Sequence, residues 1–161
     1  MWALADRTGL DLNSPYAYVL WGDHFRSSSL IAEAPSDPTP LGFVMGFRPP
    51  EDHETLFVWQ IGVDERARGR GLAARMLDHL VAELGVSHVE ATVTPSNDAS
   101  AALFRGLGAR HDAPVVAALR YGEDMFPGGH EAEVCFRIGP IGQREPGVGT
   151  PTTQPPRGDS S

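Results

Sequence analysis

The sequence predicts a single α/β domain in which a mixed β-sheet is flanked by helices. The chain has 161 residues and is 41% hydrophobic, which is enough for one buried core. Residues 55–63, T-L-F-V-W-Q-I-G-V, have the pattern of a mostly buried strand, and a glycine-rich loop and an amphipathic helix from Leu72 to Leu84 follow them. A second strand pattern covers residues 88–94. A strand, a helix and a strand in succession predict two parallel strands joined by a right-handed crossover.

The beginning of the chain is expected to supply two helices. Residues 1–8 have the pattern of the last turns of a helix that ends at Gly9. Ser14 and Pro15 suit the N-cap and the first position of a second helix. Three of its apolar residues are expected to face inward: Tyr16, Val19 and Leu20.

Two further strands are expected before the parallel pair. Residues 28–34 and 41–48 have strand patterns, and the turn-rich segment P-S-D-P-T-P lies between them. We therefore expect a hairpin that leads into the strand at 55–63.

The second half of the chain predicts a short helix at 97–107 that ends between Gly106 and Gly108. Residues 113–126 fit either a strand or a helix, and residues 133–139 predict a closing strand. The folded domain is expected at 1–140, and residues 141–161, rich in Pro, Gly, Thr and Ser, are expected to form a disordered tail.

Composition restricts the function. The formal charge of −8 and the pI near 5.1 argue against binding to nucleic acid or an anionic membrane, and they favour a cationic substrate. The single Cys135 excludes an internal disulfide, and no His, Cys and acidic spacing suggests a metal site. No stretch is apolar enough to span a membrane, and the first residues do not resemble a signal peptide, so we expect a cytoplasmic protein.

The loop R-A-R-G-R-G-L-A at 66–73 predicts an anion site. Gly69 and Gly71 leave the backbone accessible, the first amides of the next helix lack partners, and three arginines surround them. Gly69-x-Gly71-x-x-Ala74 also fits a dinucleotide-binding fingerprint with Glu90 as its acidic residue, but there the glycines directly follow the strand, and here residues 64–68 intervene. A solvated turn that binds nothing is the third interpretation.

The spacing R-x-x-G-x-G-x-A at 66–73 resembles the acetyl-CoA loop of the GNAT N-acetyltransferases. The segment from Asn97 to Gly108 resembles a second motif of that family, except that Phe104 occupies the position of a frequent general acid, tyrosine. The resemblance implies acetyl-CoA as co-substrate, bound between two parallel strands that splay apart, in a mostly antiparallel sheet. The implied cofactor-binding residues are Ile61, Val63, Arg66, Arg68, Gly69, Arg70, Gly71, Leu72, Ala73 and Asn97.

Four blocks narrow the resemblance to the L-2,4-diaminobutyrate acetyltransferases of ectoine biosynthesis. They are D-L-N-S-P-Y at 11–16, F-V-W-Q-I-G-V-D at 57–64, R-G-R-G-L-A at 68–73, and G-H-E-A-E at 129–133 followed by F-R-I. The resemblance implies direct acetyl transfer to the γ-amine of diaminobutyrate, which gives N4-acetyl-diaminobutyrate, and a homodimer. It also implies a first strand ahead of the first helix, which this sequence lacks; we expect that the start codon was placed too far downstream.

The same resemblance implies the substrate site. Asp11 and Glu133 are expected to bind cationic groups, Trp59 to form a wall of the pocket and pack over an ammonium, and His130 to relay a proton. Tyr16 is expected to hydrogen-bond the substrate or to replace the missing acid. Each residue also has an ordinary alternative role: turn cap, edge charge, surface turn or core packing. A GNAT enzyme for another small diamine or amino acid, a non-catalytic CoA-binding module and a dinucleotide oxidoreductase stay open.

Overall fold

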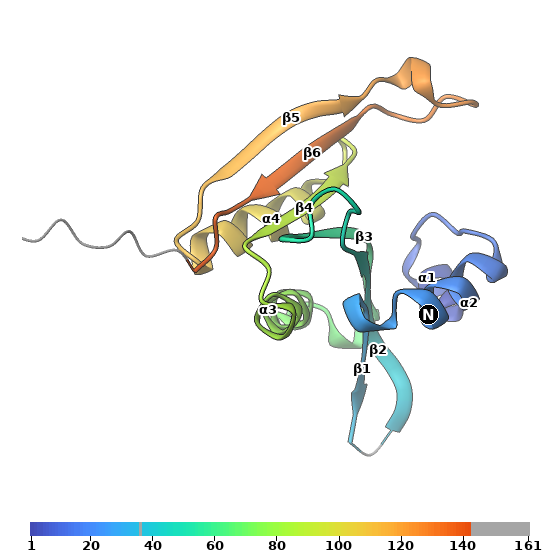
Figure 1. Ribbon diagram of the computed structural model, residues 1–161. Helices are drawn as coiled ribbons and strands as arrows, with labels where there is room; N and C mark the ends of the chain where they lie inside the picture. The colour runs from blue at the N-terminus through green and yellow to red at the C-terminus, as the bar shows by residue number, and fades with distance from the viewer. Residues whose placement is uncertain (36, 143–161) are drawn as a thin grey trace, which may run out of the picture.

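A computed structural model describes residues 1–35 and 37–142 (Figure 1). Its sheet has six strands in the order β1-β2-β3-β4-β6-β5. The strands are β1 Leu30–Ala34, β2 Asp37–Phe47, β3 Thr55–Val63, β4 His88–Val93, β5 Val115–Tyr121 and β6 Glu133–Ile138. The α-helices are α1 Trp2–Thr8, α2 Pro15–His24, α3 Leu72–Leu84 and α4 Asp98–Arg110, and short 3₁₀ helices are η1 Arg26–Ser28, η2 Glu65–Ala67 and η3 Glu123–Met125. Most of the predicted tail, residues 143–161, lies outside the described residues.

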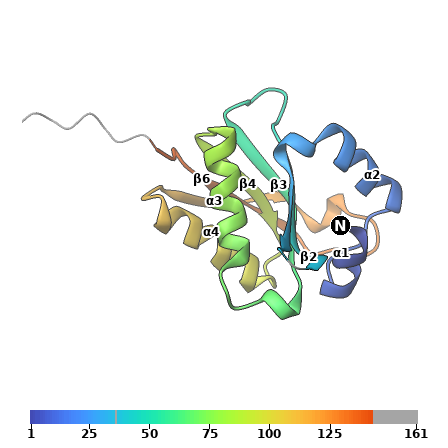
Figure 2. The same cartoon turned by 90° about the horizontal axis from the view of Figure 1, so that it is seen from below.

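Helices cover both faces of the sheet, as the sequence predicts. α3 and α4 lie on one face, and α1 and α2 lie on the other beside β2 and β3 (Figure 2). Alternating residues of β2 enter the two cores: Val44 packs with α3, whereas Phe43 and Met45 pack with Leu4 of α1 and with α2. In the described part of the chain, no helix is long and apolar enough to cross a bilayer.

The parallel pair of β3 and β4 separates along its length. The two strands pair from Thr55 opposite His88 to Val58 opposite Ala91, and no later pair follows in the described register. Beyond this point β3 continues to Val63 on β2, and β4 continues on β6. A wedge of unpaired backbone therefore opens between the carboxyl ends of the two strands.

Helix α2 shows that the predicted inward face was wrong. Tyr16 and Val19 are each 67% exposed, whereas Tyr18 is 5% exposed. The Tyr18 hydroxyl donates to Gln60 Oε1 at 3.0 Å, and the Trp21 indole N–H donates to the Gly46 carbonyl oxygen at 3.3 Å. Almost every residue of Y-A-Y-V-L-W is apolar, so hydrophobic periodicity did not indicate which face of the helix would be buried. The two hydrogen bonds lie on the buried face.

Helix α4 continues to Arg110 and does not end at the glycines. A Cβ on Gly108 would lie 2.3 Å from Val115 Cγ2 and 2.9 Å from the Ala113 carbonyl oxygen, so this glycine allows the helix to pack closely on β5. Arg110 Nε donates to Asp78 Oδ2 of α3 at 2.9 Å, which holds the last turn in place.

Two segment boundaries differ from the prediction. β2 begins at Asp37, which pairs with Ala34 of β1, so the strand includes most of the expected turn. The ambiguous segment 113–126 contains β5, which pairs antiparallel with β6 and forms the edge of the sheet.

Candidate active site

A cavity of about 750 Å³ lies between the end of β3, the loop that follows it and the start of α4. Eight of the ten predicted cofactor-binding residues line this cavity, which we call the cofactor groove: Ile61, Val63, Arg68, Gly69, Gly71, Leu72, Ala73 and Asn97. Gly9 and Leu10, which were not predicted, also line the groove and approach it from the chain between α1 and α2.

The loop before α3 has the geometry of an anion site. Gly69 and Gly71 have φ values of 70° and 67°, in the left-handed region where glycine is favoured. Gly71 is the N-cap of the 13-residue α3, and no side chain caps this end. The first amides of the helix are therefore left to an external acceptor, and the helix dipole favours a negative one.

Arg66 does not line the groove, contrary to the role expected for its side chain. Its Nε donates to Asp64 Oδ1 at 2.9 Å, and its Nη1 lies 3.8 Å from Asp37 Oδ2. The Arg66 guanidinium, with Arg7 adding to it, holds the pKa of the buried Asp64 carboxyl far below its usual range. Arg66 therefore supports the loop through its pairs with Asp64 and Asp37, which the motif did not indicate.

The other two arginines also differ from each other. Arg68 lines the groove, and its guanidinium donates to the Val63 carbonyl oxygen at 3.1 Å and to the Thr8 carbonyl oxygen at 3.4 Å. Arg70 is exposed and does not line the groove. One of the three predicted positive charges thus stands at the groove itself.

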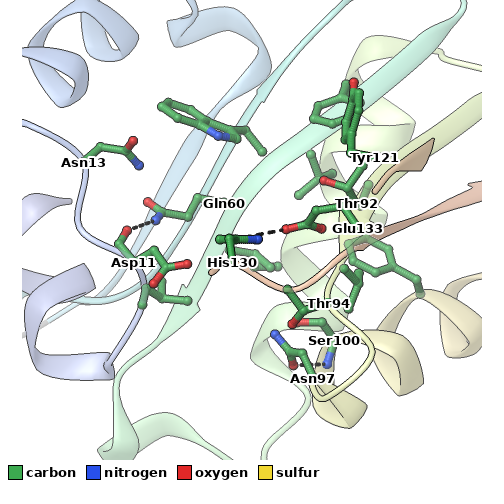
Figure 3. A pocket seen from close by; sticks show the side chains of 18 of the residues that line it. Asp11, Asn13, Gln60, Thr92, Thr94, Asn97, Ser100, Tyr121, His130 and Glu133 are labelled. Carbon is green, nitrogen blue, oxygen red and sulfur yellow. Dashed lines mark hydrogen bonds and ion pairs between the residues drawn. The ribbon is translucent and has the colours of Figure 1, made fainter. Parts of the chain in front are cut away.

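A second cavity of about 580 Å³, the acceptor cavity, adjoins the groove at the wedge between β3 and β4 (Figure 3). Leu10, Ile61, Asn97 and Ser100 line both cavities. The two spaces therefore meet at the end of the groove.

Four of the five predicted substrate-site residues line the acceptor cavity: Asp11, Trp59, His130 and Glu133. They come from the loop before α2, from β3, and from the chain leading into β6, and the fold brings them together. Tyr16 lies outside, because α2 presents Tyr18 to the sheet and leaves Tyr16 exposed to solvent.

Glu133 is a partly buried carboxylate without a full set of partners. Its side chain is 16% exposed, and among the described residues its Oε2 accepts no hydrogen bond. Burial raises the pKa of Glu133, while the Thr92 hydroxyl and His130 oppose this shift. A partly buried anion of this kind is stabilised when a cation pairs with it, so the cavity favours a positively charged group.

His130 has a defined tautomer. Its Nδ1 lies 2.6 Å from the Glu131 carbonyl oxygen, which can only accept, so Nδ1 carries a proton. Its Nε2 lies 3.7 Å from Glu133 Oε1, and its ring stacks on Phe126 with centroids 4.4 Å apart. In the neutral imidazole, Nε2 therefore carries a lone pair at the edge of the cavity, beside Glu133 Oε1.

Aromatic and hydroxyl side chains complete the wall. Trp59 is 37% exposed and stacks on Trp21 with centroids 4.0 Å apart. Phe104 lines the cavity and is 2% exposed. It stands at the position expected for a tyrosine general acid, and its side chain has no hydroxyl. Four hydroxyl residues that the sequence analysis did not single out also line it: Thr92, Thr94, Ser100 and Tyr121.

Comparisons with known proteins agree with this geometry. The family model "Acetyltransferase (GNAT) family" matches residues 2–109. An L-2,4-diaminobutyric acid acetyltransferase from Halalkalibacterium halodurans is 44% identical over 145 residues, covering 88% of this chain and 76% of the relative. One from Streptomyces avermitilis is 44% identical over 147 residues, covering 88% and 82%.

A solved structure is also similar. It is the diaminobutyrate acetyltransferase EctA from Paenibacillus lautus in complex with its substrate L-2,4-diaminobutyric acid and coenzyme A. It superposes with a TM-score of 0.79 at 46% identity, covering 86% of both chains.

Proposed function

The chain belongs to the GNAT acetyltransferase family, and from this premise we propose that it acetylates the γ-amine of L-2,4-diaminobutyrate with acetyl-CoA. The product is N4-acetyl-L-2,4-diaminobutyrate, the acetylated intermediate of ectoine synthesis. The observation that carries the choice of a cationic acceptor is the partly buried, incompletely paired Glu133 carboxylate in the wall of the acceptor cavity. That the enzyme is a cytoplasmic homodimer stays a prediction.

The cofactor groove fits acetyl-CoA. The amides at the start of α3 and the Arg68 guanidinium receive the diphosphate, since they combine a helix dipole with a fixed positive charge. The pantetheine arm lies in the wedge between β3 and β4, where the unpaired backbone of β3 offers it hydrogen bonds. The thioester then reaches the junction of the two cavities near Ile61 and Ser100.

The acceptor cavity fits a small molecule with two ammonium groups. Glu133 pairs with one of them from β6, and Asp11 faces the same cavity from the opposite side (Figure 3). Trp59 packs over the substrate, and a cation–π contact contributes on the order of 1 kcal/mol.

Transfer requires the amine in its neutral form. The reacting nitrogen loses two protons, one before the attack and one as the amide forms, and the Glu133 carboxylate, whose pKa is raised by burial, and Nε2 of a neutral His130 accept one each. The amine nitrogen attacks the thioester carbon, the C–N bond forms, and the C–S bond breaks to release the thiolate. Because Phe104 has no proton to give, the Ser100 hydroxyl at the junction donates a hydrogen bond to the thiolate. We assign no role to Tyr16, which lies outside the cavity.

The test is a coupled measurement of free thiol release. The protein is incubated with acetyl-CoA and, in parallel, with diaminobutyrate, ornithine, lysine and 1,3-diaminopropane, and the acetylated product is identified by mass spectrometry and NMR. We expect the highest kcat/KM for diaminobutyrate and the acetyl group on the γ-nitrogen. Faster turnover of another amine would show that this amine, and not diaminobutyrate, is the substrate. Binding of acetyl-CoA without turnover of any amine would indicate a non-catalytic module.

A further inference from the structure

Gln60, in the middle of β3, joins two elements that lie on the same side of the sheet. Its Oε1 accepts a hydrogen bond from the Tyr18 hydroxyl at 3.0 Å, and its Nε2 donates to the Asp11 carbonyl oxygen at 2.7 Å (Figure 3 shows the second of these). Tyr18 is buried in α2, whereas Asp11 lies in the exposed connection between α1 and α2. The side chain of one strand residue thus links a fixed helix to a loop.

The direction of the amide is determined by its partners. The Asp11 carbonyl oxygen can only accept, so the amide nitrogen must face it, and the amide oxygen then faces Tyr18. The reverse orientation would place two acceptors against each other. The Tyr18 hydroxyl, which donates to that oxygen, therefore stabilises the orientation in which Gln60 holds the loop.

The loop matters because of where it carries the Asp11 side chain. Asp11 lines the acceptor cavity, and its neighbour Leu10 lines both cavities. The Asp11 carboxylate is exposed and forms no ion pair within residues 1–35 and 37–142, so the contact at its backbone is what fixes its position. The charge of Asp11 also contributes to the raised pKa of Glu133, which indicates that the two carboxylates face a shared space.

We propose that Gln60, oriented by Tyr18, is a positioning residue for the amino acid substrate: it holds the Asp11 loop against β3 so that Asp11 meets the substrate from the side opposite Glu133. This inference rests on the proposed function, in which Asp11 binds a cationic group. Gln60 also lines the acceptor cavity, but its amide oxygen and nitrogen are engaged by Tyr18 and Asp11, so it performs no chemistry and acts through Asp11.

The test separates the KM for diaminobutyrate from the KM for acetyl-CoA. Gln60→Leu removes both hydrogen bonds of the Gln60 side chain, and the one to the Asp11 carbonyl oxygen holds the loop. We therefore expect the KM for diaminobutyrate to rise roughly two- to tenfold. The KM for acetyl-CoA should stay within about twofold, since the contact lies away from the loop at Gly69 and Gly71. Tyr18→Phe, which keeps Gln60 but releases its orientation, should shift the first KM in the same direction by less. Val19→Ala, at an exposed position of the same helix, is the matched control.

A double-mutant cycle with Asp11→Asn distinguishes positioning from a general structural role. If Gln60 acts through Asp11, adding Gln60→Leu to Asp11→Asn should change the KM for diaminobutyrate little further, so the two effects are not additive. Additive effects, an unchanged KM in Gln60→Leu, or an equal rise in both KM values would overturn the proposal. If Gln60→Leu does not fold, Tyr18→Phe decides in the same cycle. If the unmodified enzyme prefers another amine, the cycle is measured with that amine, so the two proposals fail separately.

Discussion

Replacing Glu133 by glutamine keeps the shape of the side chain and removes its charge. The side chain is 16% exposed, so a substrate ammonium that pairs with it is largely shielded from water. A hydrogen bond to a charged group contributes roughly 1.5–3 kcal/mol, which corresponds to a factor of roughly 10 to 150 in an equilibrium constant. We therefore expect Glu133→Gln to lower kcat/KM for diaminobutyrate by roughly 10- to 150-fold, and by more if Glu133 also takes the proton.

The assay is the initial rate of thiol release with either substrate varied. The KM for acetyl-CoA should change less than about twofold, because Glu133 lines the acceptor cavity and not the cofactor groove. Glu131→Gln, which removes the same charge two residues away from an exposed position, is the control and should keep nearly full activity. A loss of kcat/KM of the same size in both variants would refute the reasoning, since it would reflect only the net charge near the cavity.

Three further predictions follow from the structure. Burial raises the pKa of Glu133, so the folded protein holds this proton more tightly than the unfolded chain, and its stability falls as pH rises from the unfolded pKa through the folded one. Glu133→Gln should therefore have a higher Tm than the unmodified protein at pH 7–8, with a smaller difference near pH 4. An equal difference at both pH values would contradict this prediction. Arg68→Ala should raise the KM for acetyl-CoA roughly tenfold, because it removes a charged contact to the cofactor. Arg66→Ala breaks the pair with Asp64 and should mainly lower Tm. The reverse pattern would place Arg66 at the cofactor. Gly108→Ala should cost roughly 1–3 kcal/mol of stability by denaturant unfolding, because its Cβ would lie 2.3 Å from Val115 Cγ2, with both KM values unchanged.

Much of the fold was predictable because several local signals agree. The strand at 55–63, the helix at 72–84 and the strand at 88–93 have clear periodicity, and the handedness of crossovers then fixes the parallel pair. The errors occur where the signal is ambiguous. The apolar run in α2 did not indicate its buried face, and Gly106 and Gly108 were interpreted as a helix end although α4 continues past them.

The candidate site was predictable where a motif specifies backbone geometry. Gly69 and Gly71 were expected to leave the backbone of the loop accessible, and both adopt left-handed φ values beside the cofactor groove. Side-chain pairing was not predictable in the same way, because Arg66 turns to Asp64 and Asp37, residues whose proximity depends on how β2 meets the loop. The network of Gln60 joins three segments of the chain, and no spacing in the sequence indicates it.

The central claim is that a substrate ammonium pairs with Glu133 in the acceptor cavity, which adjoins the cofactor groove. A crystal structure of this chain with coenzyme A and diaminobutyrate tests it most directly. We predict the diphosphate on the amides at the start of α3 and an ammonium nitrogen of diaminobutyrate within hydrogen-bond distance of the Glu133 carboxylate. Diaminobutyrate bound outside the acceptor cavity, with Glu133 Oε2 still unpaired, would contradict the account.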